Sequence, residues 1–253
     1  MNCVTRGLHT LWGVLAWLSF ALIVVATLLA TILVPGRERR ERIAALMCRA
    51  VFVLPRVSVE VVGIDRLPAN KCVVVANHAS YIDGLLLKGY LPARFSFVIK
   101  GEMRDIPIAH FLLRRCGAKF VERNQHSGSA RDARQIVKAA QGGESLAFFP
   151  EGTFLEEAGV GRFRAGAFVA AVRGELPVVP IAISGTRYML PAGRFLPRPH
   201  PLKFEILPAI LPGDPDFSDS RALAETARQR ILAALDEPDL LDDSDDSGTA
   251  TSI

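Results

Sequence analysis

The sequence predicts an α/β domain with a largely parallel central sheet flanked by helices, preceded by an N-terminal hydrophobic membrane segment. Short runs rich in β-branched residues recur along the chain, helical patterns separate most of them, and Leu11 to Val34 carries no charged residue. Strands that alternate with helices are typical of a parallel sheet, whose ligand site lies beyond the strand ends. The uncharged run precedes this alternation.

The first predicted element is a membrane segment over Leu11 to Val34. Roughly 20 apolar residues suffice to cross a hydrocarbon core of about 30 Å, and this run is longer. The alternative is a cleaved signal peptide, but its apolar part covers only about 7 to 15 residues, so we expect the segment to be retained. Arginines follow it directly, which by the positive-inside rule places the rest of the chain on the cytoplasmic side of the cell inner membrane. These are Arg37, Arg39, Arg40 and Arg42.

A second segment, residues 39–54, has a charged start and apolar residues at helical spacing. Such a helix either lies flat in the headgroup layer or covers the soluble core, and the spacing fits both. We therefore assign residues 1–56 to N-terminal membrane-associated helices.

Residues 57–235 are predicted to form one domain. The strands are expected at Val57–Val62, Cys72–Ala76, Phe95–Ile99, Lys119–Val121, Leu146–Phe149, Val178–Ile183 and Leu202–Ile206. The helices between them are expected at Tyr81–Leu91, Ile108–Cys116, Ala130–Gln141 and Phe163–Arg173. A last helix carries Leu223, Ala227, Ile231 and Ala234 on one face, and residues 236–253, rich in Asp and Ser, are predicted to be an acidic disordered tail.

The charge distribution narrows the class of partner. The formal net charge is +4, but the tail holds seven of the 26 acidic residues and no basic one, so residues 1–235 carry a net charge of +11. A body this basic favours nucleic acid, lipid headgroups or a phosphorylated substrate. The uncharged anchor argues against nucleic acid, and the four cysteines lack a Cys-x-x-Cys pair, so neither a metal site nor a disulfide framework is expected.

The main candidate for chemistry is the segment Asn77 to Asp83, which follows an apolar strand. With His78 in the turn and Asp83 in the first helical turn, the imidazole can fold back onto the carboxylate. Such a carboxylate would hold the Nδ1 proton and leave Nε2 free to accept one from a substrate hydroxyl. The alternative is structural: Ser80 caps the helix, Asp83 completes a variant capping box and His78 is an ordinary turn residue.

Two further segments place polar groups at strand ends. Gly117 to Arg123 ends in a guanidinium that can grip a phosphate, or that is simply solvated. Phe148 to Thr153 forms a tight turn near the helix start at Phe163–Gly166, so a phosphate is a plausible guest there, although Glu151 and Arg164 as a surface ion pair are the alternative.

Two other strand-end features carry less chemistry. Lys100 is another cation at a strand end. Leu176 to Ile181 contains two prolines and no chemical group, and we expect it to be an edge or strand-entry element.

In order and spacing these segments resemble the glycerolipid acyltransferase family, specifically the bacterial 1-acyl-glycerol-3-phosphate (lysophosphatidate) acyltransferases. The family's His-x4-Asp block matches Asn77 to Asp83, its Gly-x-x-Phe-x-x-Arg block matches Gly117 to Arg123, and Phe-Pro-Glu-Gly-Thr is unaltered at Phe149 to Thr153. The proline strand at Leu176 to Ile181 matches as well. The resemblance covers roughly residues 58–210, so residues 57–235 would be the acyltransferase domain.

The resemblance implies that an acyl chain passes from a thioester of acyl carrier protein or coenzyme A to the free 2-hydroxyl of lysophosphatidate, giving phosphatidate, with no further cofactor. Membrane lipid and the thioester carrier would be the partners. By the same resemblance His78 is the base, Asp83 orients it and Arg123 binds the phosphate. The other substrate-binding candidates are Lys100, Glu151, Gly152, Thr153 and Arg164.

One position departs from the family pattern, and other functions stay open. Arg164 stands where the family often has lysine. The planar fork of a guanidinium would therefore replace the point contact of an ammonium group. The acceptor can be another lysolipid or an ornithine-containing lipid, and a non-catalytic phospholipid-binding protein is a further alternative. Ser145 lies in an approximate Gly-x-Ser-x-Gly pattern, but it precedes a strand, whereas a hydrolase nucleophile follows one.

Overall fold

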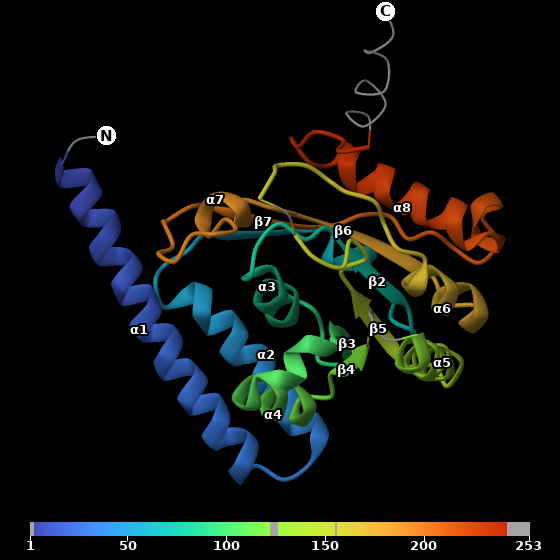
Figure 1. The fold of residues 1–253 in the computed structure, drawn as a ribbon, viewed down its shortest axis with the longest axis horizontal. Coiled ribbons are helices and arrows are strands. Elements are labelled where there is room, and N and C mark those ends of the chain that lie inside the picture. Colours follow the sequence, from blue (N-terminus) through green and yellow to red (C-terminus); the bar gives the residue numbers. More distant parts are fainter. Residues whose placement is uncertain (1–2, 122–125, 155, 242–253) are drawn as a thin grey trace, which may run out of the picture.

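A computed structural model of the chain describes residues 3–121, 126–154 and 156–241 and confirms the predicted fold class (Figure 1). A seven-stranded sheet runs in the order β1-β7-β6-β2-β5-β3-β4. Neighbouring strands are parallel except β6 and β7, which are antiparallel. The strands are β1 (Val59–Val62), β2 (Val73–Ala76), β3 (Phe95–Lys100), β4 (Lys119–Val121), β5 (Ser145–Phe148), β6 (Val178–Ser184) and β7 (Leu202–Ile206).

Helices cover both faces of this sheet, as Figure 1 shows. The α-helices are α1 (Cys3–Leu33), α2 (Arg37–Val53), α3 (Asp83–Tyr90), α4 (Pro107–Arg115), α5 (His126–Gln141), α6 (Gly166–Gly174), α7 (Thr186–Met189) and α8 (Ser220–Ala233). Short 3₁₀ helices are η1 (Ile64–Arg66), η2 (Gly101–Asp105) and η3 (Pro215–Ser218). Helices α5, α6 and α8 pack on one face, and α2 and α3 on the other.

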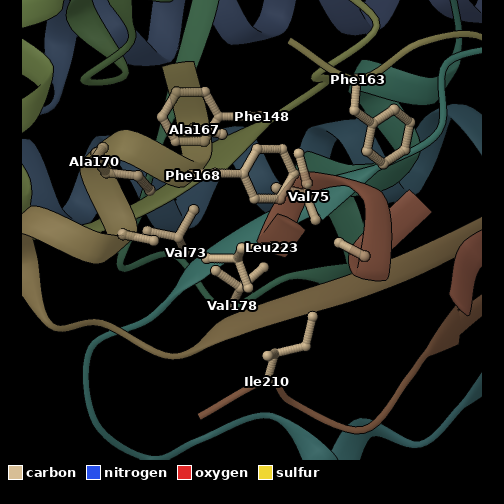
Figure 2. Packing of buried hydrophobic residues seen from close by; sticks show 14 of the residues in the cluster. Val73, Val75, Phe148, Phe163, Ala167, Phe168, Ala170, Val178, Ile210 and Leu223 are labelled. Atoms are coloured by element: carbon tan, nitrogen blue, oxygen red, sulfur yellow. The ribbon is translucent and has the colours of Figure 1, made fainter. Parts of the chain in front are cut away.

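Strand β2 is apolar throughout because both of its faces are buried. Val73 and Val75 belong to the hydrophobic cluster under α6 and α8, whereas Val74 and Ala76 belong to the cluster under α2 and α3. Figure 2 shows Val73 and Val75 on the side of the sheet where Phe168 of α6 lies. Two buried faces account for a continuous apolar run without polar alternation, which is the pattern of a central parallel strand.

The proline segment was expected to be an edge or strand-entry element. Strand entry is confirmed for Pro177, which directly precedes β6, but the edge position is wrong, because β6 lies inside the sheet between β7 and β2. Pro180 pairs with Val75 of β2, and its carbonyl accepts the N–H of Leu207 on the β7 side. The N–H and C=O of a strand residue point to the same neighbour, so the donor that proline lacks also faces β7. The paired register with β7 begins at Ile181, so the donor that proline lacks falls at the end of the β6–β7 ladder.

Helix α1 lies along the side of the domain (Figure 1). It contains one apolar stretch long enough to cross a membrane, Thr5–Leu33, and its length and composition indicate membrane association. Hydrogen bonds nevertheless tie it to the domain at both ends. Trp12 Nε1 donates to the Pro55 carbonyl at 3.0 Å, and Arg115 of α4 donates to the Thr31 carbonyl.

Helix α2 covers the soluble core, one of the two alternatives for residues 39–54. Phe52 is fully buried in the cluster beneath it. Gly89 of α3 lets the two helices approach closely, since a Cβ at this position would lie 2.9 Å from the backbone nitrogen of Arg49. The Arg49 guanidinium also donates to the Gly89 carbonyl at 3.1 Å.

The acidic tail differs from expectation in its first residues. Residues 236–241, here called the C-terminal strap, lie against the segment before α6, where Val160 N–H donates to Pro238 at 3.0 Å and Leu240 N–H donates to Val160. Asp239 receives two 2.7 Å hydrogen bonds from the buried Arg228 of α8. Disorder is therefore wrong for the strap, whereas residues 242–253 lie outside the described part.

Burial makes three cysteines poor nucleophiles. It raises the pKa of Cys48 to about 12 and that of Cys72 to about 11, and the same cause raises the pKa of Cys116. Because the thiolate is the reactive form, these residues are structural.

Candidate active site

The candidate site lies where β2 and β5 end. These strands are parallel neighbours, with Val75 paired to Phe148, so the turns that follow them meet at the same edge of the sheet. His78 comes two residues after β2 and Glu151 three after β5, and the His78 N–H donates to Glu151 Oε1 at 2.7 Å. The topology thus joins two motifs that lie far apart in the sequence.

The predicted contact between imidazole and carboxylate is present. His78 Nδ1 lies 2.9 Å from Asp83 Oδ2, with the Asp83 side chain fully buried and that of His78 18% exposed. The same Oδ2 accepts the backbone N–H groups of Ala79 at 2.6 Å and Ser80 at 2.7 Å. An oxygen held by two backbone donors fixes Nδ1 as the protonated nitrogen, which leaves Nε2 as a proton acceptor.

Aromatic rings wall the imidazole on two sides. Phe149 stacks on the ring of His78 with centroids 4.3 Å apart, and Phe154 meets it edge-on at 4.8 Å. Tyr81 in turn packs edge-on against Phe154. These contacts fix the plane of the imidazole. The sequence motifs did not indicate them, because an apolar residue that follows a strand is normally part of the hydrophobic core.

Glu151 connects the two turns. Its Oε1 accepts the His78 N–H, and its Oε2 accepts the Gly161 N–H at 3.1 Å. Burial raises the pKa of Glu151, and the two backbone hydrogen bonds oppose this rise. Because both oxygens already accept backbone donors, the carboxylate holds the loop that ends at Gly161 against the His78 turn; the ion pair with Arg164 considered from the sequence does not form.

Two polar side chains anchor the His78 turn to the rest of the sheet. Asn77 exchanges two hydrogen bonds with the backbone of Ile183 in β6, at 2.9 and 2.8 Å. Ser80 does not cap α3; its hydroxyl donates to the Leu190 carbonyl at 2.6 Å. In the sequence, the one indication that Asn77 and Ser80 have these roles is that they lie close to His78.

The remaining predicted residues have different outcomes. Lys100 ends β3 and pairs with Glu102 at 2.6 Å. Gly152 adopts a positive φ of 85° in the turn after β5, and the next residue, Thr153, is exposed. Arg164 is exposed, and its backbone N–H donates to the Pro150 carbonyl.

Arg123 lies outside the described residues, so the structure does not place it. Among the described residues, no group of three His, Cys, Asp or Glu side chains is arranged to hold a metal ion.

The C-terminal strap reaches the loop beyond Glu151. Glu237 pairs with Arg187 at 3.3 Å and accepts the N–H of Gly159. Arg187 also donates to the Glu157 carbonyl at 2.8 Å. The strap therefore supports the loop that carries Phe154 and Gly161, the two loop positions that contact the His78 ring and the Glu151 carboxylate.

Comparison with known proteins identifies the class. The family model described as Acyltransferase matches residues 58–184, about half of the chain. This range contains His78, Asp83 and Glu151. The chain belongs to the Acyltransferase family.

Individual relatives of the chain are also named as acyltransferases. It is 29% identical to a 1-acyl-sn-glycerol-3-phosphate acyltransferase of Pseudomonas aeruginosa, over 64% of this chain and 64% of that protein. It is also 31% identical to a lyso-ornithine lipid O-acyltransferase of the same organism, over 71% of this chain and 65% of that protein. The chain spans between 46% and 64% of the length of the first curated relatives it matches.

A solved structure shares the fold. The 1-acyl-sn-glycerophosphate acyltransferase of Thermotoga maritima superposes with a TM-score of 0.73 at 23% identity and covers all of both chains.

Proposed function

We propose that this acyltransferase moves an acyl chain from an acyl thioester to the free 2-hydroxyl of lysophosphatidate, giving phosphatidate. The observation that carries the proposal is the 2.9 Å contact between His78 Nδ1 and the buried Asp83 carboxylate. It supplies a general base with an unprotonated Nε2 at the end of β2, where a ligand of an α/β sheet is expected. The relatives named 1-acyl-sn-glycerol-3-phosphate acyltransferase support the same reaction.

In the proposed reaction His78 is the base and Asp83 is its positioning residue. Nε2 takes the proton of the 2-hydroxyl while the hydroxyl oxygen attacks the thioester carbonyl carbon. A new C–O bond forms and the carbonyl electron pair moves to oxygen. When this intermediate collapses, the C–S bond breaks, the electrons leave with sulfur and the thiolate takes the proton back from the imidazolium, which Asp83 stabilises meanwhile.

The finer assignments follow the family resemblance. Arg123 is proposed to bind the phosphate of the acceptor, with Lys100 and Arg164 as further cations near the strand ends. Acyl carrier protein or coenzyme A carries the acyl group. The arginines after α1 support a site on the cytoplasmic side of the inner membrane.

A second candidate acceptor is a lyso-ornithine lipid. The 31% identity to a lyso-ornithine lipid O-acyltransferase favours it. The same base serves both acceptors, but an ornithine headgroup offers no phosphate to Arg123. If lysophosphatidate is the acceptor, Arg123→Ala raises its KM strongly, because a hydrogen bond to a charged group contributes roughly 1.5 to 3 kcal/mol. An unchanged KM selects the other headgroup.

The decisive experiment compares His78→Ala with the wild-type chain in vesicles that contain lysophosphatidate and an acyl thioester. We expect turnover to fall about 10²- to 10⁴-fold, the typical contribution of a positioned base. Cosedimentation with the same vesicles should be unchanged. His110→Ala is a matched control, since His110 lies on α4 against Phe120. Equal phosphatidate formation by wild type and His78→Ala would eliminate catalysis by this residue.

A further inference from the structure

The loop between α7 and β7, residues 190–201, connects the candidate site to the apolar helix α1. At its start, the Leu190 carbonyl accepts the hydroxyl of Ser80, two residues from His78. Further along, the carbonyl of Phe195 accepts the indole N–H of Trp17 at 2.8 Å. This α7–β7 loop therefore touches both the catalytic turn and the middle of α1.

Leu196 of the loop packs closely against α1, whereas its neighbour Phe195 is exposed. A Cβ at Gly13 would lie 2.7 Å from Leu196 Cγ, so the absence of a side chain on α1 lets Leu196 pack against the helix. The Phe195 side chain is 89% exposed, more than any other large apolar side chain in the described part of the chain. Packing within the protein therefore does not explain why position 195 carries a large apolar side chain.

The surroundings of Phe195 indicate which environment covers it. Trp17, whose indole binds the Phe195 carbonyl, is itself 38% exposed, and Val14 one turn before it is exposed as well, so Phe195 adjoins exposed apolar side chains of a helix suited to a bilayer. Apolar patches of this extent on a soluble protein mark a contact with a partner or a membrane. Because the neighbouring helix is the membrane segment, hydrocarbon is the occupant that is continuous with it.

Cations flank this apolar tip. Arg194 precedes Phe195 and Arg198 follows three residues later, and residues 190–201 contain no Asp or Glu. Arg194 is half-buried and Arg198 is exposed, so both lie at the surface of the protein. One carboxylate does face the loop: Glu156 Oε1 would lie 3.3 Å from a Cβ at Gly193. An apolar side chain between two arginines matches the layering of a membrane surface, where phosphates lie above hydrocarbon.

We propose that the α7–β7 loop inserts Phe195 into the hydrocarbon beside α1, while Arg194 and Arg198 contact lipid phosphates. Insertion holds the loop at the bilayer, and the Leu190–Ser80 hydrogen bond carries that position to the His78 turn. If the proposed function is right, the acceptor lipid reaches the base from the membrane surface without leaving it. The insertion itself does not depend on the reaction.

Depth-dependent quenching tests the insertion directly. Phe195→Trp in the full chain is reconstituted in phosphatidylcholine–phosphatidylglycerol vesicles with brominated or ordinary acyl chains. Gln229→Trp, exposed on α8 across the sheet, is the matched control, and Trp12 and Trp17 give both variants the same background. We expect bromine to quench the added emission of Phe195→Trp and not that of Gln229→Trp. Equal added emission in both vesicle types for Phe195→Trp, whether residue 195 faces water or a second copy, overturns the proposal.

A rate measurement tests the consequence for catalysis. Because burial of a phenylalanine side chain biases an equilibrium about 10- to 100-fold, Phe195→Asp should lower the rate on bilayer lysophosphatidate about tenfold or more. It should leave the rate on a short-chain, water-soluble lysophosphatidate unchanged, and Phe195→Leu should retain both rates. Equal losses on both acceptors overturn the access argument. If no variant forms phosphatidate, the proposed function fails, whereas the quenching result still decides insertion.

Discussion

Replacement of Asp83 by asparagine separates the charge of this side chain from its geometry. Oδ2 of Asp83 accepts hydrogen bonds from Ala79, Ser80 and His78, whereas Oδ1 is buried and makes none within the described residues. The amide oxygen of asparagine must face the two backbone N–H groups, because an amide NH₂ there would meet two donors. Nδ1 of His78 therefore keeps its acceptor, and Nε2 stays the base.

The size of the effect follows from the lost charge. A hydrogen bond to a charged partner contributes about 1.5 to 3 kcal/mol, and a neutral one about 0.5 to 1.5 kcal/mol. The difference of about 1 to 2 kcal/mol applies when His78 becomes an imidazolium, so we expect Asp83→Asn to lower turnover about 5- to 30-fold. This is smaller than the loss of about 10²- to 10⁴-fold expected for His78→Ala.

Initial rates of phosphatidate formation by the two variants and wild type in identical vesicles measure this difference. Thermal unfolding of each variant checks that the chain stays folded. A loss with Asp83→Asn as large as that with His78→Ala would mean that the imidazole adopts the other tautomer. An unchanged rate would mean that the negative charge takes no part. Either result refutes the argument from the Oδ2 contacts.

Three further predictions concern stability and are measured by urea unfolding of the detergent-solubilised chain. Asp239→Asn removes the charge and one of the two hydrogen bonds to buried Arg228, so the free energy of unfolding should fall by about 2 kcal/mol; no change would mean that the strap is not held by this pair. Because burial raises the pKa of Glu151, its contribution to stability is fully present below about pH 4 and is lost as pH rises through the raised pKa. The stability of wild type relative to Glu151→Gln should therefore fall as pH rises above about 4, and a relative rise would contradict the direction of the shift. Gly89→Ala forces a Cβ against the Arg49 backbone and should destabilise by about 1 kcal/mol after the better helix propensity of alanine is counted, whereas a more stable variant would show that α2 can yield.

The strands and helices were predictable because each carries its own local pattern. Strand β2 is continuously apolar since both faces are buried, and glycines mark the ends of α5 and α6 in the sequence. The interior position of β6 was not predictable, because a proline is tolerated where its missing N–H points to the end of a ladder. Whether Pro180 falls at such a point depends on the register with β7, which no local pattern contains.

The same distinction between local pattern and tertiary arrangement holds for the candidate site. His78 and Asp83 lie within one turn, so their contact followed from a spacing of five residues. The contact of Glu151 with the His78 backbone needs β2 and β5 to be neighbours, and the strand order is a property of the whole sheet. The order of the strap was not predictable from composition, because a segment poor in apolar groups gives no sign that Asp239 will pair with the buried Arg228 of the preceding helix α8.

Because burial keeps the thiols of Cys48 and Cys72 protonated, the proposed reaction can be followed with a thiol reagent. Each proposed turnover liberates a carrier thiol, which an aromatic disulfide reagent reports as a continuous change in colour. Such reagents combine with thiolates, and groups with the pKa values of Cys48 and Cys72 are ionised to less than about one part in a thousand near neutral pH. Neither of these two side chains then adds to the chromogenic signal, and both escape inactivation by the reagent during the assay.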